Sequence, residues 1–250
     1  MPITFLQARC NGTYVTGESE RNNTWGPVHA ALFDMDNTLF DFIHAQRYAC
    51  RAVLRHCGQD GDPDRLFAYF RRPVHGFEHH DNIRDFLTDS GIFTDRIFAE
   101  CCELYEAEKI AAIEPYPGIA RILASLRDED VPLGIITDAD TPLAAKRLEK
   151  AGLSSFFATV ISPDRSGARK PEPASFLLAL HELHTVPGET VLAGDSLRRD
   201  IAPAQRIGMI TVYAKYGDWY RSGDHEPCMP DYVAGSVNEM EQVLVSLTRS

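Results

Sequence analysis

The chain has 250 residues, of which 44% are hydrophobic and 24% are charged, and its formal net charge is −11. This length allows one large core, or a core domain with a smaller insertion. The acidic balance argues against a nucleic-acid partner, because phosphate backbones bind to basic surfaces, and it equally disfavours adsorption to anionic membranes.

The N-terminal part of the chain contains an extension and then the first predicted strand. Residues 1–29 are polar and rich in Gly, Asn and Thr, with no sustained periodicity. We interpret them as an extension in which residues 3–6 could add an edge strand. The apolar residues 30–33 form the first strand.

The next block has apolar residues at helical spacing and no strand-like alternation. It predicts a helix over 45–57 that ends at Gly58, shorter helices over 66–70 and 83–87, and a longer one over 98–112.

Helices and strands alternate after the sequence Pro-Tyr-Pro-Gly at residues 115–118. The predicted strands are 131–136, 158–161, 190–193, 209–213 and 232–234, and the predicted helices are 119–126, 142–151, 173–184, 201–207 and 237–247. Strands separated by helices at this spacing pair in parallel, so we predict an α/β fold with a doubly wound parallel sheet.

The first strand is separated from its predicted sheet partners by roughly seventy residues, which is too long for a simple crossover. We therefore expect a helical domain over 41–114, inserted into a core formed by residues 30–40 and 115–250.

Two carboxylates, Asp34 and Asp36, directly follow the first strand. The carboxyl ends of strands in open α/β sheets form the edge at which ligands bind. One carboxylate can attack phosphorus, the other can move a proton, and together they can hold a hard cation. Taken alone, the pair is equally consistent with a turn or a helix cap.

Three more polar groups follow predicted core strands. Thr137 and Asp138 form a turn whose hydroxyl and backbone N–H groups suit a phosphate oxygen. Lys170 lies in the sequence Arg-Lys-Pro-Glu-Pro at residues 169–173 and can supply a point charge. Gly-Asp-Ser at residues 194–196, followed by Asp200, adds a carboxylate where a cation would need one.

In this order, Asp34-x-Asp36, Thr137, Lys170-Pro and Gly-Asp195 resemble the four motifs of the haloacid dehalogenase-like superfamily, over residues 30 to about 247. The family has a Rossmann-like core, and the helical block is similar to its helical cap. The resemblance implies a nucleophile at Asp34 that forms an aspartyl-phosphate. It implies an acid and base at Asp36, and phosphate binding by Thr137 and Lys170.

The resemblance also implies a Mg²⁺ site formed by Asp34, the backbone carbonyl of Asp36, and Asp195. Asp200 would orient Lys170 or a metal-bound water. The physical chemistry agrees, because clustered carboxylates repel one another unless cations lie among them.

Asp138 departs from the family pattern, which often has Asn at this position. A carboxylate facing phosphate is unfavourable, so we expect Asp138 to offer its backbone N–H and to turn its side chain away. Similar Thr-Asp turns occur in archaeal-type members of the family.

Residues 69–80 contain two arginines, three histidines and three aromatic residues. They could present positive charge to an anionic substrate, but a solvated basic loop is the favoured interpretation. The histidines lack further ligands at a matched spacing, so a metal site is the least favoured.

The chain has no apolar run as long as a membrane span and no signal-peptide pattern, and its six cysteines include no Cys-x-x-Cys pair. We expect a cytoplasmic protein whose cysteines are reduced and mostly pack in the core.

The predicted function is a Mg²⁺-dependent phosphatase that acts on a small phosphorylated metabolite. A phosphomutase is the nearest alternative, although nothing in the sequence demands a bisphosphate intermediate. A dehalogenase would have no use for the proton carrier Asp36. A catalytically silent phosphate sensor would need neither a nucleophile nor an acid.

Overall fold

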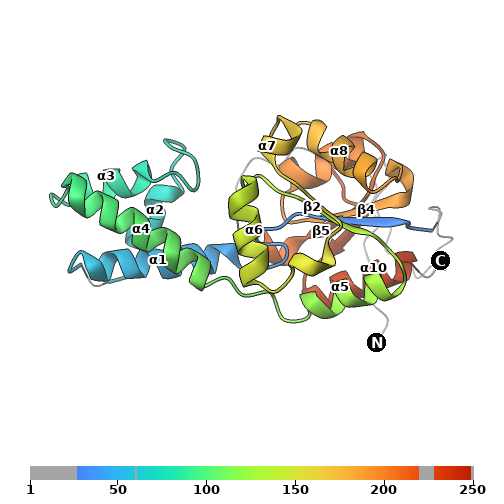
Figure 1. The fold of residues 1–250 in the computed structure, drawn as a ribbon, viewed down its shortest axis with the longest axis horizontal. Helices are drawn as coiled ribbons and strands as arrows, with labels where there is room; N and C mark the ends of the chain where they lie inside the picture. Colours follow the sequence, from blue (N-terminus) through green and yellow to red (C-terminus); the bar gives the residue numbers. More distant parts are fainter. Residues whose placement is uncertain (1–26, 60, 220–227, 249–250) are drawn as a thin grey trace. The chain divides into compact units, whose positions relative to one another are not determined.

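A computed structural model describes residues 27–59, 61–219 and 228–248. The chain divides into two compact units, Asp41–Glu114 and a core unit made of Met1–Phe40 and Pro115–Ser250 (Figure 1). The predicted extension, apart from residues 27–29, and the predicted edge strand at 3–6 lie outside the described residues.

The core unit is built on a six-stranded sheet with the strand order β3-β2-β1-β4-β5-β6, and every pair of neighbouring strands is parallel. Its strands are β1 (Ala30–Phe33), β2 (Leu133–Ile136), β3 (Thr159–Ile161), β4 (Thr190–Gly194), β5 (Ile210–Ala214) and β6 (Tyr232–Ala234). The prediction of a doubly wound parallel sheet is confirmed.

Helices cover both faces of this sheet. Figure 1 shows α5 (Ile119–Asp128) and α10 (Val237–Thr248) on one face, and α7 (Pro163–Ser166) and α8 (Ala174–Glu182) on the other. This double cover explains why strand β1 is a continuous apolar run whose residues are all buried. The remaining core helices are α6 (Thr141–Lys150) and α9 (Ala202–Arg206).

Strand β1 lies at the centre of the sheet, between β2 and β4. From β1 the chain builds β2 and β3 on one side and then β4, β5 and β6 on the other. The point at which the strand order reverses is where open α/β sheets bind ligands. The residues that follow β1 and β4 therefore lie at the expected position of a site.

The segment after β4 differs from the single helix predicted over 201–207. A π-helical turn, Leu197–Ile201, precedes the short helix α9. The Asp200 carboxylate accepts a hydrogen bond from the backbone N–H of Ser196 at 2.9 Å, while Pro203, near the start of α9, has no N–H to donate. Turns of this kind inside helices often accompany functional sites.

The other unit consists of α1 (Phe42–His56), α2 (Asp64–Phe70), α3 (Asp81–Asp89) and α4 (Asp95–Ala111). Asp41 caps α1 and Thr94 caps α4 through side-chain oxygens that accept backbone N–H groups. The rings of Phe70 and Tyr105 stack in its apolar core with centroids 4.8 Å apart.

The five cysteines within the described residues form no disulfide. No helix of these residues is long and apolar enough to cross a membrane.

The loop after β1 is held by close contacts within the core unit. Asn37 adopts a left-handed conformation with φ of 61°, and the hydroxyl of Tyr216 donates to the carbonyl of Thr38 at 2.7 Å. Gly217 packs so closely against this loop that a Cβ atom there would lie 1.8 Å from the carbonyl oxygen of Asn37. The loop that carries Asp34 and Asp36 therefore depends on a glycine far away in the sequence.

We expect Gly217→Ala to lower the free energy of unfolding by about 1–3 kcal/mol, because the backbone must move to admit the methyl group. Urea denaturation of the full chain measures this. Gly188→Ala is the matched control, since a Cβ atom at Gly188 meets nothing within 4 Å. Equal denaturation midpoints for the two variants would contradict the packing described.

Candidate active site

The carboxylate of Asp34 is buried at the carboxyl end of β1. Its Oδ1 accepts a hydrogen bond from Lys170 Nζ at 2.5 Å, and its Oδ2 accepts one from the hydroxyl of Thr38 at 3.2 Å. The backbone N–H of Asp34 donates to the carbonyl of Ala193, which fixes the residue against β4. Each oxygen of this carboxylate therefore has a defined donor.

Lys170 joins two carboxylates that are far apart in the sequence. Its ammonium lies 2.5 Å from Asp34 Oδ1 and 2.6 Å from Asp200 Oδ1, and it also donates to the carbonyl of Ile136 at 3.2 Å. Burial alone would lower the pKa of Lys170, but the charges of Asp200 and Asp34 outweigh burial and raise it. The side chain is therefore a permanent cation between the two carboxylates.

Asp195, at the end of β4, is the third carboxylate of the cluster. Burial, followed by the charges of Asp34 and Asp200, raises the pKa of Asp195 well above its usual range. Its Oδ1 is buried without a hydrogen-bond partner among the described residues. Asp34, Asp195 and Asp200 each offer an oxygen, and these oxygens lie within 4.8 Å of one another.

This cluster suits a hard divalent cation. Three buried carboxylates outnumber the single ammonium between them, and one oxygen has no partner in the described part of the chain. Carboxylate oxygens are the ligands that Mg²⁺ prefers. Gly194 permits the arrangement, because a Cβ atom there would lie 2.6 Å from Asp200 Cβ.

Asp36 forms an ion pair that the sequence did not predict. Arg147 of α6 donates from Nη1 to Asp36 Oδ2 at 2.6 Å, and its side chain is 0% exposed, whereas that of Asp36 is 21% exposed. An arginine on the buried face of α6, beside Ala144 and Leu148, is the signal that could have revealed this pair.

Thr137 and Asp138 form the predicted turn after β2. The hydroxyl of Thr137 accepts the backbone N–H of Ala139 at 3.1 Å, and α6 begins later, with Asp140 at its N-cap. Asp138 accepts the backbone N–H of Lys170 at 2.9 Å through Oδ1, and its Oδ2 lies 3.4 Å from Nη1 of Arg199. The Asp138 carboxylate thus contacts the lysine-bearing segment and a second arginine.

Arg199 and Thr38 also escaped the sequence-based prediction. Arg199 precedes Asp200 in the π-helical turn, and the charges of Asp200, Asp195 and Asp34 raise its pKa against the opposing effect of burial. Thr38 lies four residues after Asp34 in the opening motif, and this spacing was the signal that could have revealed its hydrogen bond to Asp34. The core unit thus adds two buried or half-buried arginines and one hydroxyl to the predicted set.

The comparisons with known proteins agree with this geometry. A family model described as "Haloacid dehalogenase-like hydrolase" matches residues 31–214. The chain is 30% identical over 237 residues to the glyceraldehyde 3-phosphate phosphatase of Methanopyrus kandleri, covering 89% of this chain and 99% of that protein. It is 29% identical over 222 residues to the phosphoglycolate phosphatase of Neisseria meningitidis, covering 87% and 94%.

Solved structures show the same fold. A crystal structure of a HAD phosphatase from Thermococcus onnurineus is 27% identical, with a TM-score of 0.59 over 87% of this chain and 98% of that one. A HAD-hydrolase of Bacillus subtilis, determined with bound magnesium, is 21% identical with a TM-score of 0.69 over 88% and 100%. The family model, these relatives and the order of the motifs lead to one conclusion: the chain belongs to the haloacid dehalogenase-like hydrolases.

Proposed function

We propose that this protein is a Mg²⁺-dependent phosphatase that hydrolyses a small organic phosphate monoester through an aspartyl-phosphate on Asp34. The observation that carries the proposal is the position of the Asp34 carboxylate, held by Lys170 beside Asp195 and Asp200. A carboxylate oriented in this way is suited to in-line attack, since phosphoryl transfer depends mainly on positioning and on charge stabilisation.

In the first step an oxygen of Asp34 attacks phosphorus, and the bond from phosphorus to the ester oxygen breaks. Asp36 gives a proton to the departing oxygen, which leaves as an alcohol. Lys170 balances the charge of the transferring phosphoryl group, and the hydroxyl of Thr137 and the backbone N–H of Asp138 offer donors to its oxygens.

In the second step water attacks phosphorus, and Asp36 removes the proton of that water. The bond from phosphorus to Asp34 breaks, so the carboxylate is restored and inorganic phosphate is released. Arg147 fixes the direction of the Asp36 carboxylate in both steps through its contact at 2.6 Å.

A bound Mg²⁺ would supply charge neutralisation between Asp34 and the substrate phosphate. Asp34, Asp195 and the carbonyl of Asp36 would hold it, and the unpartnered oxygen of Asp195 supports this assignment. Asp200, which contacts Lys170 at 2.6 Å, keeps the ammonium in place.

The relatives support a small phosphorylated metabolite as the substrate. Their names specify glyceraldehyde 3-phosphate and phosphoglycolate. Release of inorganic phosphate from a panel that contains both compounds, with and without Mg²⁺, tests the proposed function. Absence of turnover on every phosphate monoester, including an activated aryl phosphate, would refute it.

Two substitutions separate the roles of the opening aspartates. Asp34→Asn should abolish turnover, because an amide is a poor nucleophile. Asp36→Asn should slow turnover by about 10²–10⁴-fold, the usual contribution of general acid–base catalysis. The loss in kcat/KM should be smallest for aryl phosphates with the best leaving groups. Measurable turnover by Asp34→Asn would mean that another residue attacks phosphorus.

Removal of the metal should affect activity and stability together. Chelation should abolish turnover and Mg²⁺ should restore it. In chelator, Asp195→Asn should melt at or above the temperature of the unmodified protein. The reason is that the raised pKa of Asp195 makes its ionised form costly at neutral pH when no cation is bound. Added Mg²⁺ should then raise the melting temperature of the unmodified protein but not that of the variant.

The melting temperature in Mg²⁺ also shows which outcome would contradict the assignment of Asp195. If Mg²⁺ raised the melting temperature of Asp195→Asn as much as that of the unmodified protein, Asp195 would not be a ligand.

Arg147 is a positioning residue whose effect should depend on the leaving group. Arg147→Met should lower kcat/KM most for poor leaving groups, which rely on proton transfer from Asp36, and Arg147→Lys should restore part of the loss. Initial rates on a series of aryl phosphates measure this dependence. An equal loss for every leaving group would assign Arg147 a purely structural role.

A further inference from the structure

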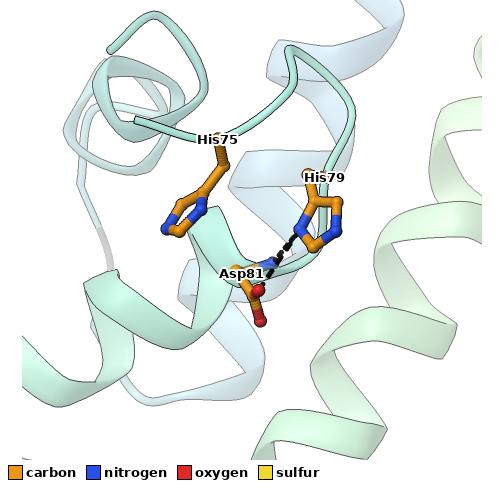
Figure 2. A group of neighbouring side chains, drawn as sticks. All are labelled: His75, His79 and Asp81. Carbon is orange, nitrogen blue, oxygen red and sulfur yellow. Dashed lines mark hydrogen bonds and ion pairs between the residues drawn. The ribbon is translucent and has the colours of Figure 1, made fainter. Parts of the chain in front are cut away.

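A second group of candidate metal ligands lies in the helical unit, in the segment between α2 and α3 and in the first turn of α3. Figure 2 shows its members, His75, His79 and Asp81, gathered around the start of α3. Each offers one ligand atom, and these atoms lie within 4.8 Å of one another. All three side chains are accessible to solvent, so an ion can reach them without unfolding of the protein.

A carboxylate orients the ring of His75. Asp85 Oδ2 lies 3.2 Å from His75 Nε2, and Arg72 holds the same oxygen at 2.6 Å. This contact engages Nε2, so Nδ1 is the nitrogen of His75 that can bind a metal. Histidine ligands commonly use their second nitrogen in this way, and the carboxylate behind the ring raises the basicity of the ligand.

His79 and Asp81 form the other part of the group. Nδ1 of His79 lies 3.4 Å from Asp81 Oδ2 and accepts the backbone N–H of Asp81 at 3.2 Å. The rings of His75 and His79 stack with centroids 5.8 Å apart and planes inclined by 25°. When a metal binds, Nδ1 of His79 gives up its 3.2 Å contact with the backbone N–H of Asp81 and binds the ion instead.

The charge of Asp81 also favours a cation. A carboxylate oxygen is an accepted ligand of Zn²⁺, and Nε of Arg84 donates to Oδ1 of Asp81 at 3.1 Å. Arg84 contacts Oδ1, while Oδ2 faces His79. One carboxylate oxygen is thus directed toward the two imidazoles.

We propose that His75, His79 and Asp81 form a binding site for a divalent transition-metal ion of the Zn²⁺ type. Two imidazoles and one carboxylate suit Zn²⁺, Ni²⁺ or Cu²⁺, whereas the all-carboxylate cluster of the core suits Mg²⁺. Water completes the coordination. The ion ties the segment between α2 and α3 to the first turn of α3. This proposal stands independently of the phosphatase mechanism.

Calorimetric titration of the full chain with Zn²⁺ tests the proposal. It should detect one binding event at His75, His79 and Asp81 and another at the carboxylate cluster of the core, and a different variant should remove each. His79→Ala should remove the event of the helical unit while phosphatase activity in Mg²⁺ is retained. Asp195→Asn should remove binding to the core cluster and leave the other event intact. A crystal soaked in Zn²⁺ should show an anomalous peak at about 2.0–2.2 Å from the three ligand atoms.

Asp85→Asn provides a finer test, because it leaves all three ligands in place. It should weaken Zn²⁺ binding by about 10-fold or more, as substitutions behind a metal-binding histidine do. Asp89→Asn, at the other end of α3, is the matched control and should have no effect, since Asp89 contacts Tyr69. Identical titrations of the unmodified protein and His79→Ala, or equal effects of the two α3 variants, would overturn the proposal.

Discussion

The ammonium of Lys170 is the interaction on which the site of the core unit depends. It lies between Asp34 and Asp200, which follow two adjacent strands of the sheet, and all three side chains are buried. Without this cation, three carboxylates would share one buried volume and would repel one another strongly. Burial, followed by the charges of Asp34 and Asp200, raises the pKa of Asp195 even with Lys170 present, and a bound cation would offset that cost.

The net charge of −11 repels an anionic substrate, so the site needs local positive charge, and the core unit supplies part of it. Lys170 and Arg199 place positive charge beside the carboxylates of the site, and Arg147 contacts Asp36. Positive charge from residues 69–80 was the alternative source. In that segment Arg72 pairs with Asp85 and lies 4.0 Å above the ring of Tyr69, so its charge is engaged within the helical unit. These core cations are themselves paired with carboxylates, so the proposed mechanism relies on Mg²⁺ for the remaining positive charge.

The fold, and the grouping of the candidate site residues at one sheet edge, could be predicted from the sequence because both depend on local patterns. Buried parallel strands are short apolar runs, and polar residues placed directly after them must meet at one sheet edge. The π-helical turn at Leu197–Ile201 could not be inferred, since it depends on the side-chain contact of Asp200 with the Ser196 N–H. Arg147 was missed for a similar reason: its partner lies 111 residues away in the sequence.

Asp138 shows how a departure from a family pattern can be accommodated. The Asp138 carboxylate accepts the backbone N–H of Lys170 and lies near Arg199. The charge of this arginine offsets the extra negative charge that Asp138 brings to the site. We expected the backbone N–H of Asp138 to serve phosphate while the side chain turned away. The observed partners give the side chain a separate role in fixing the segment that carries Lys170.

The central claim is that the Asp34 carboxylate becomes covalently phosphorylated during turnover. Treatment of the enzyme with borohydride during turnover reduces an acyl phosphate to an alcohol, and peptide mass spectrometry locates the modified residue. We predict that residue 34 is converted to homoserine only when a phosphate monoester and Mg²⁺ are both present. Conversion at another aspartate, or complete turnover with no residue converted, would contradict the account.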